Sequence, residues 1–197
     1  MNNVQTQIRR ATHAEVLTSV PARRLFAVMT FTLLTAFSAH VSAPLPGTAV
    51  PVSLQTLVVL LSGMLLGPAL GAAAQTAYLM AGAAGLPVFA AGFGLPYLFG
   101  PTGGYLLAFP AAAAVAGAVA VHAQGGTARR VAMLTLAGAL ATLTVYAGGT
   151  AQLTLLTGDP AGALRLGVLP FIIGDLAKLA LAVVLALRIR RRTLALL

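Results

Sequence analysis

The 197-residue sequence contains no cysteine and no tryptophan, and charged residues make up only 8% of it. The absence of cysteine excludes a disulfide framework, a thiol nucleophile and a thiolate metal site. The low charge content excludes an ordinary soluble domain, in which about 25% of residues are charged. Since 59% of the residues are hydrophobic, the composition predicts an all-α integral membrane protein with a single domain.

Two classes of binding motif are also missing. No G-x-x-x-x-G-K-[ST] sequence occurs, so the chain itself does not bind ATP in the manner of a P-loop protein. The three histidines, His13, His40 and His122, lie in different segments and lack the spacing of a metal site.

The net charge of +9 could indicate nucleic-acid binding. The basic residues cluster at the ends of apolar runs, however, which favours a role in membrane orientation instead.

What the sequence does contain is a series of apolar runs that predict membrane helices. They cover residues 25–40, 52–66, 70–86, 104–121, 131–156 and 170–187. Several are shorter than the roughly 20 residues of a full crossing, so we expect residues at the interfaces to complete them. The prediction is a compact six-helix membrane domain at residues 23–192, preceded by a cytoplasmic segment 1–22 and followed by a tail 193–197.

The arginines predict the orientation of these helices. With a cytoplasmic N-terminus and six spans, all arginines except Arg165 lie in cytoplasmic segments. These cytoplasmic arginines are Arg9, Arg10, Arg23, Arg24, Arg129, Arg130, Arg188, Arg190, Arg191 and Arg192. The positive-inside rule therefore favours a multi-pass protein with both termini in the cytoplasm.

The predicted external loops are unusually apolar. Residues 41–51, 87–103 and 157–169 are rich in proline and glycine but carry few charges, whereas a solvated linker is polar. We expect these three loops to pack over a cavity at the outer side of the membrane.

Asp175 and Lys178 are the only acid and the only lysine within a predicted span. A charge at the centre of a membrane helix costs about 2.5–3.5 kcal/mol on insertion scales, and such charges usually pair or face a cavity. Their i, i+3 spacing places both on one helix face, roughly 8 and 12 Å along a helix that starts near Pro170. The pair is therefore either a clamp for a polar solute or a salt bridge that only fixes packing.

Other polar residues leave their role open. Gln55 and Tyr78 could contact a ligand or serve only helix packing. The glycine-rich turn Gly100-Pro-Thr-Gly-Gly-Tyr105 could approach a ligand or simply be a tight re-entrant turn. Thr32 and Ala36 form a small-residue face that could pack internally or dock a partner.

Four motifs in order resemble the BioY family, the biotin-specific S components of energy-coupling factor (ECF) transporters. They are Pro51-Val-Ser-Leu-Gln-Thr-Leu-Val-Val-Leu-Leu, Gly85-Leu-Pro-Val-Phe, Gly100-Pro-Thr-Gly-Gly-Tyr and Gly174-Asp-Leu-Ala-Lys. The resemblance spans about residues 25–190. It implies the S-component fold in a prokaryotic cytoplasmic membrane and high-affinity capture of biotin from outside.

The same resemblance implies a transport protein rather than an enzyme, with biotin as its ligand and no cofactor. The implied partners are a transmembrane coupling protein and two ATPase subunits, or further copies of the chain if it works without such a module. Asp175 and Lys178 would bind the ureido ring of biotin. The biotin-binding set implied by the matching motifs and the neighbouring polar groups is Asp175, Lys178, Gln55, Tyr78, Gly103, Gly104 and Tyr105.

The sequence also departs from the family pattern. Residues 91–99 carry no charge, although many relatives have a basic residue in this loop, so the group that meets the biotin carboxylate is not identified. Ala27 is followed four residues later by Phe31, an imperfect match to the family's docking motif. The alternatives are an S component for another vitamin, a structural membrane subunit, or an intramembrane enzyme that uses Asp175. No nucleophile–base pair supports the enzyme.

Overall fold

The structure of the chain is a computed structural model that describes residues 19–196. Most of the predicted N-terminal segment 1–22 therefore lies outside the described residues. The described α-helices are α2 (Val20–His40), α3 (Gln55–Leu66), α4 (Pro68–Ala83), α5 (Gly103–Ala120), α6 (Thr127–Thr157), α7 (Pro160–Gly167) and α8 (Ile172–Leu196). A short hairpin of β1 (Ser42–Ala43) and β2 (Val52–Ser53) follows α2, and two 3₁₀ turns, η1 (Leu95–Phe99) and η2 (Leu169–Phe171), precede α5 and α8.

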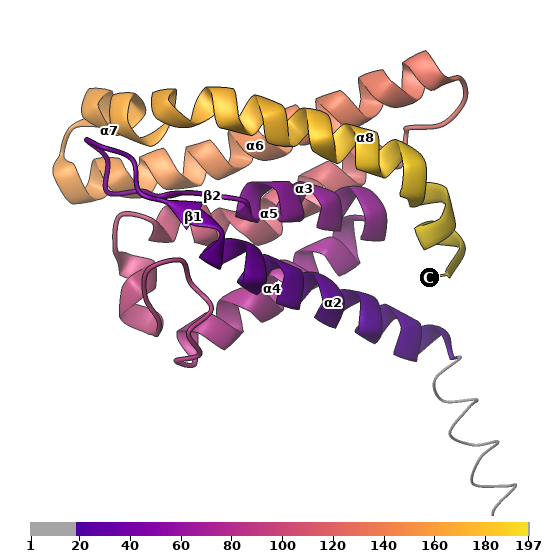
Figure 1. Cartoon of the computed structure of the whole chain (residues 1–197), viewed down its shortest axis with the longest axis horizontal. Helices are drawn as coiled ribbons and strands as arrows, with labels where there is room; N and C mark the ends of the chain where they lie inside the picture. Colours follow the sequence, from indigo (N-terminus) through magenta and orange to yellow (C-terminus); the bar gives the residue numbers. More distant parts are fainter. Residues whose placement is uncertain (1–18, 197) are drawn as a thin grey trace, which may run out of the picture.

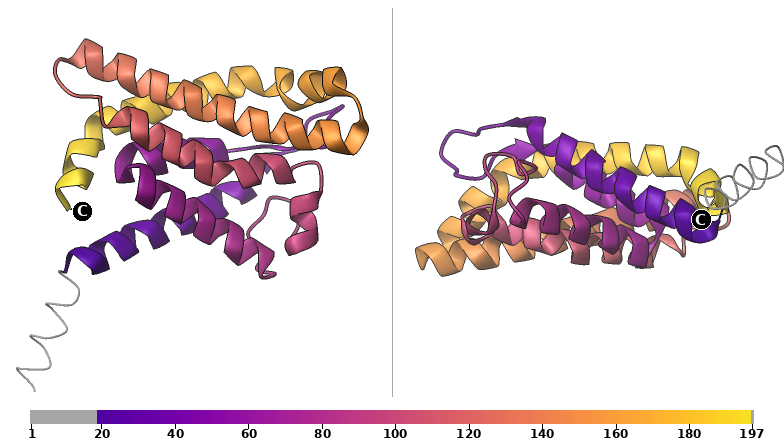
Figure 2. Two further views of the ribbon diagram at one scale, coloured as in Figure 1. Left: turned by 180° about the vertical axis from the view of Figure 1, so that it is seen from behind. Right: turned by 90° about the horizontal axis from the view of Figure 1, so that it is seen from below.

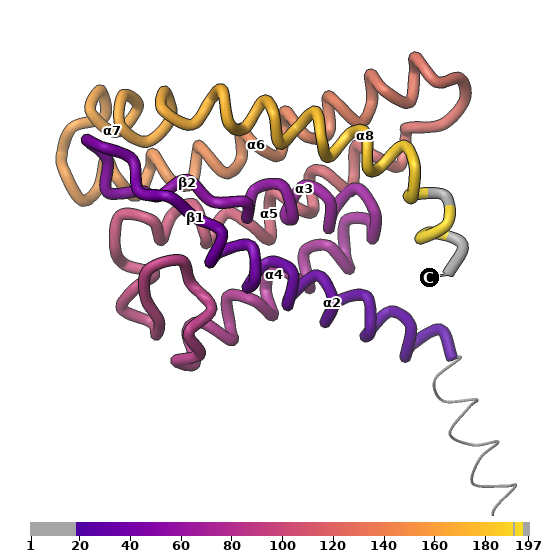
Figure 3. Tube along the Cα trace, in the orientation of Figure 1, coloured from indigo at the N-terminus to yellow at the C-terminus, as the bar shows by residue number. Residues whose placement is uncertain are grey.

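The helices form two layers. In Figure 1, α2, α3 and α8 lie towards the viewer, and the reverse view of Figure 2 brings α4, α5 and α6 to the front. Helix α5 is central, because it contacts α3, α4 and α6. Three parts of the chain gather at one end of the bundle: the hairpin, helix α7, and the segment that precedes α5 (Figure 3). The α5–α6 connection and the C-terminus lie at the other end.

Each of the six predicted membrane runs contains a helix, although the run 52–66 begins with strand β2 and α3 starts only at Gln55. Helix α7 was not predicted. The expectation of a loop at residues 157–169 was wrong, because local signals start a helix there. Asp159 caps it by accepting a hydrogen bond of 2.9 Å from the backbone N–H of Gly162, and Pro160 suits the first helical position. Gly158, with φ of +70°, ends α6 in the left-handed conformation and turns the chain back.

Four helical segments are long and apolar enough to cross a membrane: α2, α5, α6 and the segment Pro160–Arg190 that ends in α8. Helix α3, with 12 residues, is about 18 Å long at 1.5 Å per residue, and so is shorter than the hydrocarbon core. Gly67, with φ of +83°, and Pro68 break the apolar run between α3 and α4. The described chain is thus a helical membrane protein with four apolar spans and one shorter apolar helix, α3.

Small residues allow the helices to approach closely. Ala112, Ala113 and Ala116 on α5 are fully buried. A Cβ atom on Gly63 of α3 would overlap the backbone oxygen of Ala113. Such contacts between small residues are the usual way in which membrane helices pack, because lipid offers no hydrophobic force between them.

A buried polar network joins α2 to α3 and α4. The Nε2 atom of Gln75 donates to Thr35 Oγ1 at 3.2 Å and to Ser62 Oγ at 3.1 Å. Thr32 Oγ1 donates to the Ala74 carbonyl at 2.9 Å. Thr32 on the small-residue face of α2 therefore packs internally against α4.

Candidate functional site

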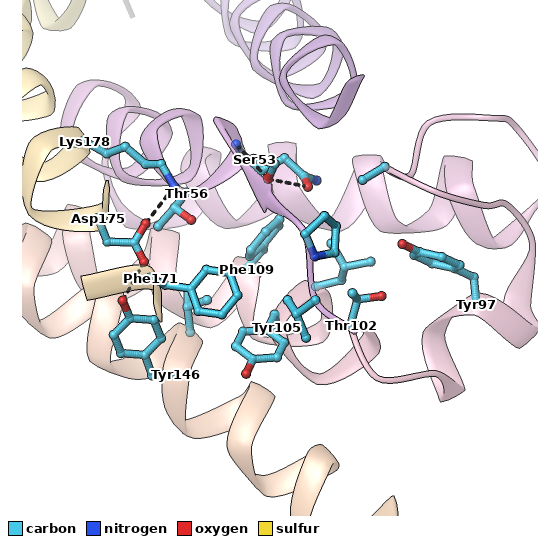
Figure 4. A pocket seen from close by; sticks show the side chains of 16 residues that line it. Ser53, Thr56, Tyr97, Thr102, Tyr105, Phe109, Tyr146, Phe171, Asp175 and Lys178 are labelled. Atoms are coloured by element: carbon cyan, nitrogen blue, oxygen red, sulfur yellow. Dashed lines mark hydrogen bonds and ion pairs between the residues drawn. The ribbon is translucent and has the colours of Figure 1, made fainter. Parts of the chain in front are cut away.

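A cavity lies beneath the hairpin and the segment before α5, with a volume of about 60 Å³. We call it the Asp175 cavity. The residues that line it come from the hairpin, the loops and α3, α5, α6 and α8 (Figure 4). They are Val50, Pro51, Ser53, Gln55, Thr56, Ala90, Tyr97, Thr102, Tyr105, Leu106, Phe109, Val145, Tyr146, Phe171, Asp175 and Lys178. The predicted cover of apolar loops is thus observed for the segments 41–51 and 87–103.

Asp175 and Lys178 form an ion pair at one end of this cavity. Lys178 Nζ lies 2.8 Å from Asp175 Oδ1, and the two residues are only 8% and 6% exposed. Asp175 lies in the first turn of α8, because the 3₁₀ turn η2 delays the helix that was expected to start near Pro170. The positive end of the helix dipole favours a carboxylate at this position.

Tyr146 on α6 is the residue of this cluster that the sequence analysis did not identify. Its hydroxyl donates a hydrogen bond of 2.6 Å to Asp175 Oδ2. Each carboxylate oxygen of Asp175 therefore has a partner, with Lys178 on one and Tyr146 on the other (Figure 4). The sequence feature that could have identified Tyr146 is its position in the middle of a long apolar span, where a tyrosine hydroxyl needs a hydrogen-bond partner.

Gln55 lines the same cavity from the start of α3, directly after the hairpin. Its Oε1 accepts a hydrogen bond of 3.0 Å from Ser53, and its Nε2 donates to the Tyr78 hydroxyl at 2.7 Å. Tyr78 in turn donates to the Val88 carbonyl at 3.2 Å. Tyr78 is fully buried and is not among the lining residues. It therefore orients Gln55 through this hydrogen bond without lining the cavity itself.

The glycine-rich turn contributes less to the cavity than the sequence suggested. The ring of Tyr105 lines it, but the hydroxyl donates to the Gly167 carbonyl at 2.8 Å. Gly103 and Gly104 do not line it. A Cβ on Gly103 would overlap the Leu98 carbonyl, and one on Gly104 would overlap the Gly148 carbonyl, so both glycines serve close packing around α5.

The lining is polar at its ends, and between them it combines aromatic rings with Ser53 (Figure 4). In Figure 4, Asp175, Lys178 and Thr56 lie on one side, Tyr97 and Thr102 on the other, and Phe171, Phe109 and Tyr105 between. Gln152 holds the segment that carries Tyr97, because its Nε2 donates to the carbonyls of Leu98 at 2.9 Å and Gly100 at 2.6 Å. The arrangement suits an elongated ligand with polar groups at its ends and an apolar body.

Within residues 19–196, no group of three or more His, Cys, Asp or Glu side chains could hold a metal ion. The site is therefore described by its ion pair, its amide and hydroxyl groups, and its aromatic walls.

Comparisons with known proteins agree on one family. The family model of the BioY family matches residues 9–195. The chain is 38% identical over 174 residues to "Probable biotin transporter BioY" of Pyrococcus horikoshii, which covers 87% of this chain and 99% of the relative. It is 37% identical over 171 residues to "Biotin transporter BioY" of Thermotoga maritima, with 86% and 96% covered.

A solved structure supports the same grouping. The chain matches the crystal structure of the S component for biotin from an ECF-type ABC transporter with a TM-score of 0.76 and 25% sequence identity. The match covers 87% of this chain and 92% of that one. The helical architecture described above is therefore the S-component fold.

Proposed function

The chain belongs to the BioY family and is a biotin-transport S component of the ECF type, and we propose that it captures biotin in the Asp175 cavity. The observation that carries this proposal is the buried ion pair of Asp175 and Lys178 on the cavity wall. Charged residues inside a membrane protein are costly to bury, and pairs of this kind commonly mark a substrate pathway. ATP hydrolysis would be supplied by partner subunits.

The ureido ring of biotin fits the polar end of the cavity. Its two N–H groups need acceptors, and its carbonyl needs a donor. The Asp175 carboxylate can accept from the N–H groups, while the Lys178 ammonium can donate to the carbonyl. Gln55, which carries both an acceptor and a donor, lines the same cavity and would add a further polar contact.

The remaining parts of biotin would follow the aromatic walls. The thiophane ring and aliphatic tail are apolar, so they would lie between Phe109, Phe171 and Tyr105. The tail carboxylate would then reach Tyr97 and Thr102 at the other side. These hydroxyls donate hydrogen bonds without a charge, which agrees with the absence of basic residues in the stretch 91–99.

The volume of about 60 Å³ is well below the 300–1,000 Å³ typical of small-molecule sites. Biotin binding would therefore move the walls apart. Two segments of the cavity wall, the hairpin and the segment before α5, belong to no membrane-spanning helix. Their displacement would therefore open the cavity at least cost to the helix packing.

The orientation and the assembly belong to the same proposal. Six crossings with both termini in the cytoplasm would place Arg129, Arg130, Arg188 and Arg190 inside and Arg165 outside. The membrane domain would cover residues 23–192, flanked by a cytoplasmic segment 1–22 and a tail 193–197.

With this orientation, the Asp175 cavity would face outwards in a prokaryotic cytoplasmic membrane. A transmembrane coupling protein and two ATPases would drive release. A chain that works without such a module would instead assemble with further copies of itself.

A competition experiment tests the substrate. The purified full chain is incubated with labelled biotin, and unlabelled biotin, thiamin and riboflavin are added in turn. We expect saturable binding that only biotin displaces. Binding of thiamin or riboflavin in place of biotin would contradict the proposal and identify an S component for another vitamin. The appearance of a chemically altered product would point to an enzyme.

A further inference from the structure

A second cavity lies at the end of the bundle opposite the Asp175 cavity. It has a volume of about 390 Å³, and among its lining residues are Gln124, Gly125, Arg130, Leu134, Arg190 and Leu194. They come from the α5–α6 connection, the start of α6 and the end of α8, which lie together in Figure 1. We call it the Arg130–Arg190 cavity.

The two arginines are held in place by backbone carbonyl groups of neighbouring helices. Arg130 on α6 donates to the Leu187 carbonyl of α8 at 3.1 Å. Arg190 on α8 donates through Nε to the Met64 carbonyl, in the last turn of α3, at 2.8 Å. Both side chains are partly buried. The two guanidinium groups are thus fixed on the wall of one cavity instead of extending freely into solvent.

These bonds leave most of the guanidinium donors available. A guanidinium has five N–H groups, and within residues 19–196 each of these two donates one hydrogen bond to the protein. The acids in the same range, Asp159 and Asp175, lie towards the opposite end: Asp159 caps α7, and Asp175 pairs with Lys178. Two cations therefore share a cavity without a carboxylate from the described residues to balance them.

The surroundings of this cavity combine charge with apolar surface. Leu134 and Leu194 line it beside the arginines. Val131 and Ile189, adjacent in sequence to Arg130 and Arg190, are 37% and 41% exposed. Fixed guanidinium groups match the oxygen atoms of a phosphate. Apolar side chains next to them match the start of acyl chains at the membrane interface.

We propose that the Arg130–Arg190 cavity binds the phosphate of an anionic phospholipid headgroup, with the acyl chains lying along the neighbouring apolar surface of α6 and α8. The ligand chemistry shared with free phosphate is the phosphate oxygens, but the apolar lining favours the lipid. Such a bound lipid would bridge α6 and α8 at this end of the bundle. The proposal does not depend on biotin binding.

The test uses the full chain reconstituted in vesicles of equimolar phosphatidylglycerol and phosphatidylcholine, then extracted and examined by native mass spectrometry. We expect roughly tenfold more retained phosphatidylglycerol than phosphatidylcholine, and loss of this preference in the double variant Arg130→Gln/Arg190→Gln. The matched control is Arg129→Gln/Arg188→Gln, which removes two exposed arginines at the same end and should keep the preference. Equal retention of both lipids by the wild-type chain, or an unchanged preference in the Arg130→Gln/Arg190→Gln variant, would overturn the proposal.

Two further measurements complete the test. Inorganic phosphate in molar excess should not displace phosphatidylglycerol, and complete displacement would assign the cavity to free phosphate instead. Because the arginines also hold helix ends, the double variant could lose its fold. Thermal unfolding of the wild-type chain therefore serves as the second readout. Phosphatidylglycerol should raise its Tm in a saturable manner and phosphatidylcholine should not, and the absence of this difference would also overturn the proposal.

Discussion

The hydroxyl of Tyr146 on α6 donates a hydrogen bond of 2.6 Å to Oδ2 of Asp175 on α8. This bond and the ion pair to Lys178 fix the plane of the carboxylate, because one partner holds each oxygen atom. A carboxylate fixed in this way presents its remaining acceptor sites in constant directions. Tyr146 is thus a positioning residue for the acid that we propose to bind the ureido ring.

Removal of the Tyr146 hydroxyl should weaken biotin binding. The change Tyr146→Phe keeps the ring on the cavity wall but removes the bond to a charged acceptor. Since hydrogen bonds to charged groups contribute about 1.5–3 kcal/mol to stability, the carboxylate of the variant is held less firmly. We therefore expect affinity for biotin to fall several-fold. Isothermal titration calorimetry on the purified chain would measure this.

The matched control for this change is Tyr105→Phe. The Tyr105 hydroxyl donates to the Gly167 carbonyl, so its loss should lower the free energy of unfolding by about 1 kcal/mol and leave biotin affinity nearly unchanged. Equal effects of the two substitutions on biotin affinity would show that Tyr146 has no special role.

Two buried glutamines should behave differently. Gln55 lines the Asp175 cavity, whereas Gln75 joins Thr35 and Ser62 away from it. Both changes to leucine should lower the Tm, because hydrogen bonds between membrane helices contribute about 0.6 kcal/mol on average. Only Gln55→Leu should also weaken biotin binding. A loss of binding in Gln75→Leu as large as that in Gln55→Leu would contradict the assignment of Gln55 to the site.

The packing role of Gly104 can be tested with a second glycine. A Cβ at Gly104 would overlap the Gly148 carbonyl on α6, whereas one at Gly174 would meet nothing within 4 Å. Overpacking of this kind costs about 1–3 kcal/mol, so Gly104→Ala should lower the Tm clearly. Gly174→Ala, in an open helical position next to Asp175, should leave the Tm unchanged or raise it slightly. A stable Gly104→Ala variant that loses only biotin binding would instead support a direct contact with the ligand.

The sequence predicted the helices well because apolar runs and their breaks have simple causes. Gly67-Pro68 separates α3 from α4, and each of the six runs contains a helix. Helix α7 was missed because eight residues are too few for a membrane run, although Asp159-Pro160 is a recognisable helix start. The likeness to the BioY family, based on four short motifs, is confirmed by the family model and by the relatives.

Charge identified two of the predicted site residues, and the motifs identified Gln55 and Tyr105, which also line the cavity. Asp175 and Lys178 stand out as charges in an apolar run, and the structure places them together on the cavity wall. Tyr146 lies 29 residues from Asp175 in sequence, and only the packing of α6 against α8 brings them together. Gly103 and Gly104 were assigned to the site by motif, because a glycine needed for helix packing and one needed for a ligand look alike in a sequence.

Substitution of the buried pair tests the central claim most directly. Biotin affinity is measured for Asp175→Asn and for the double change Asp175→Asn/Lys178→Met, which avoids leaving an unpaired buried charge. Asp159→Asn serves as the control, because asparagine can also cap α7. We predict that both variants at Asp175 retain the fold but lose biotin affinity by at least about 100-fold, while the control binds as the wild type does. Tight biotin binding by the folded double variant would contradict the account and leave the pair a structural salt bridge.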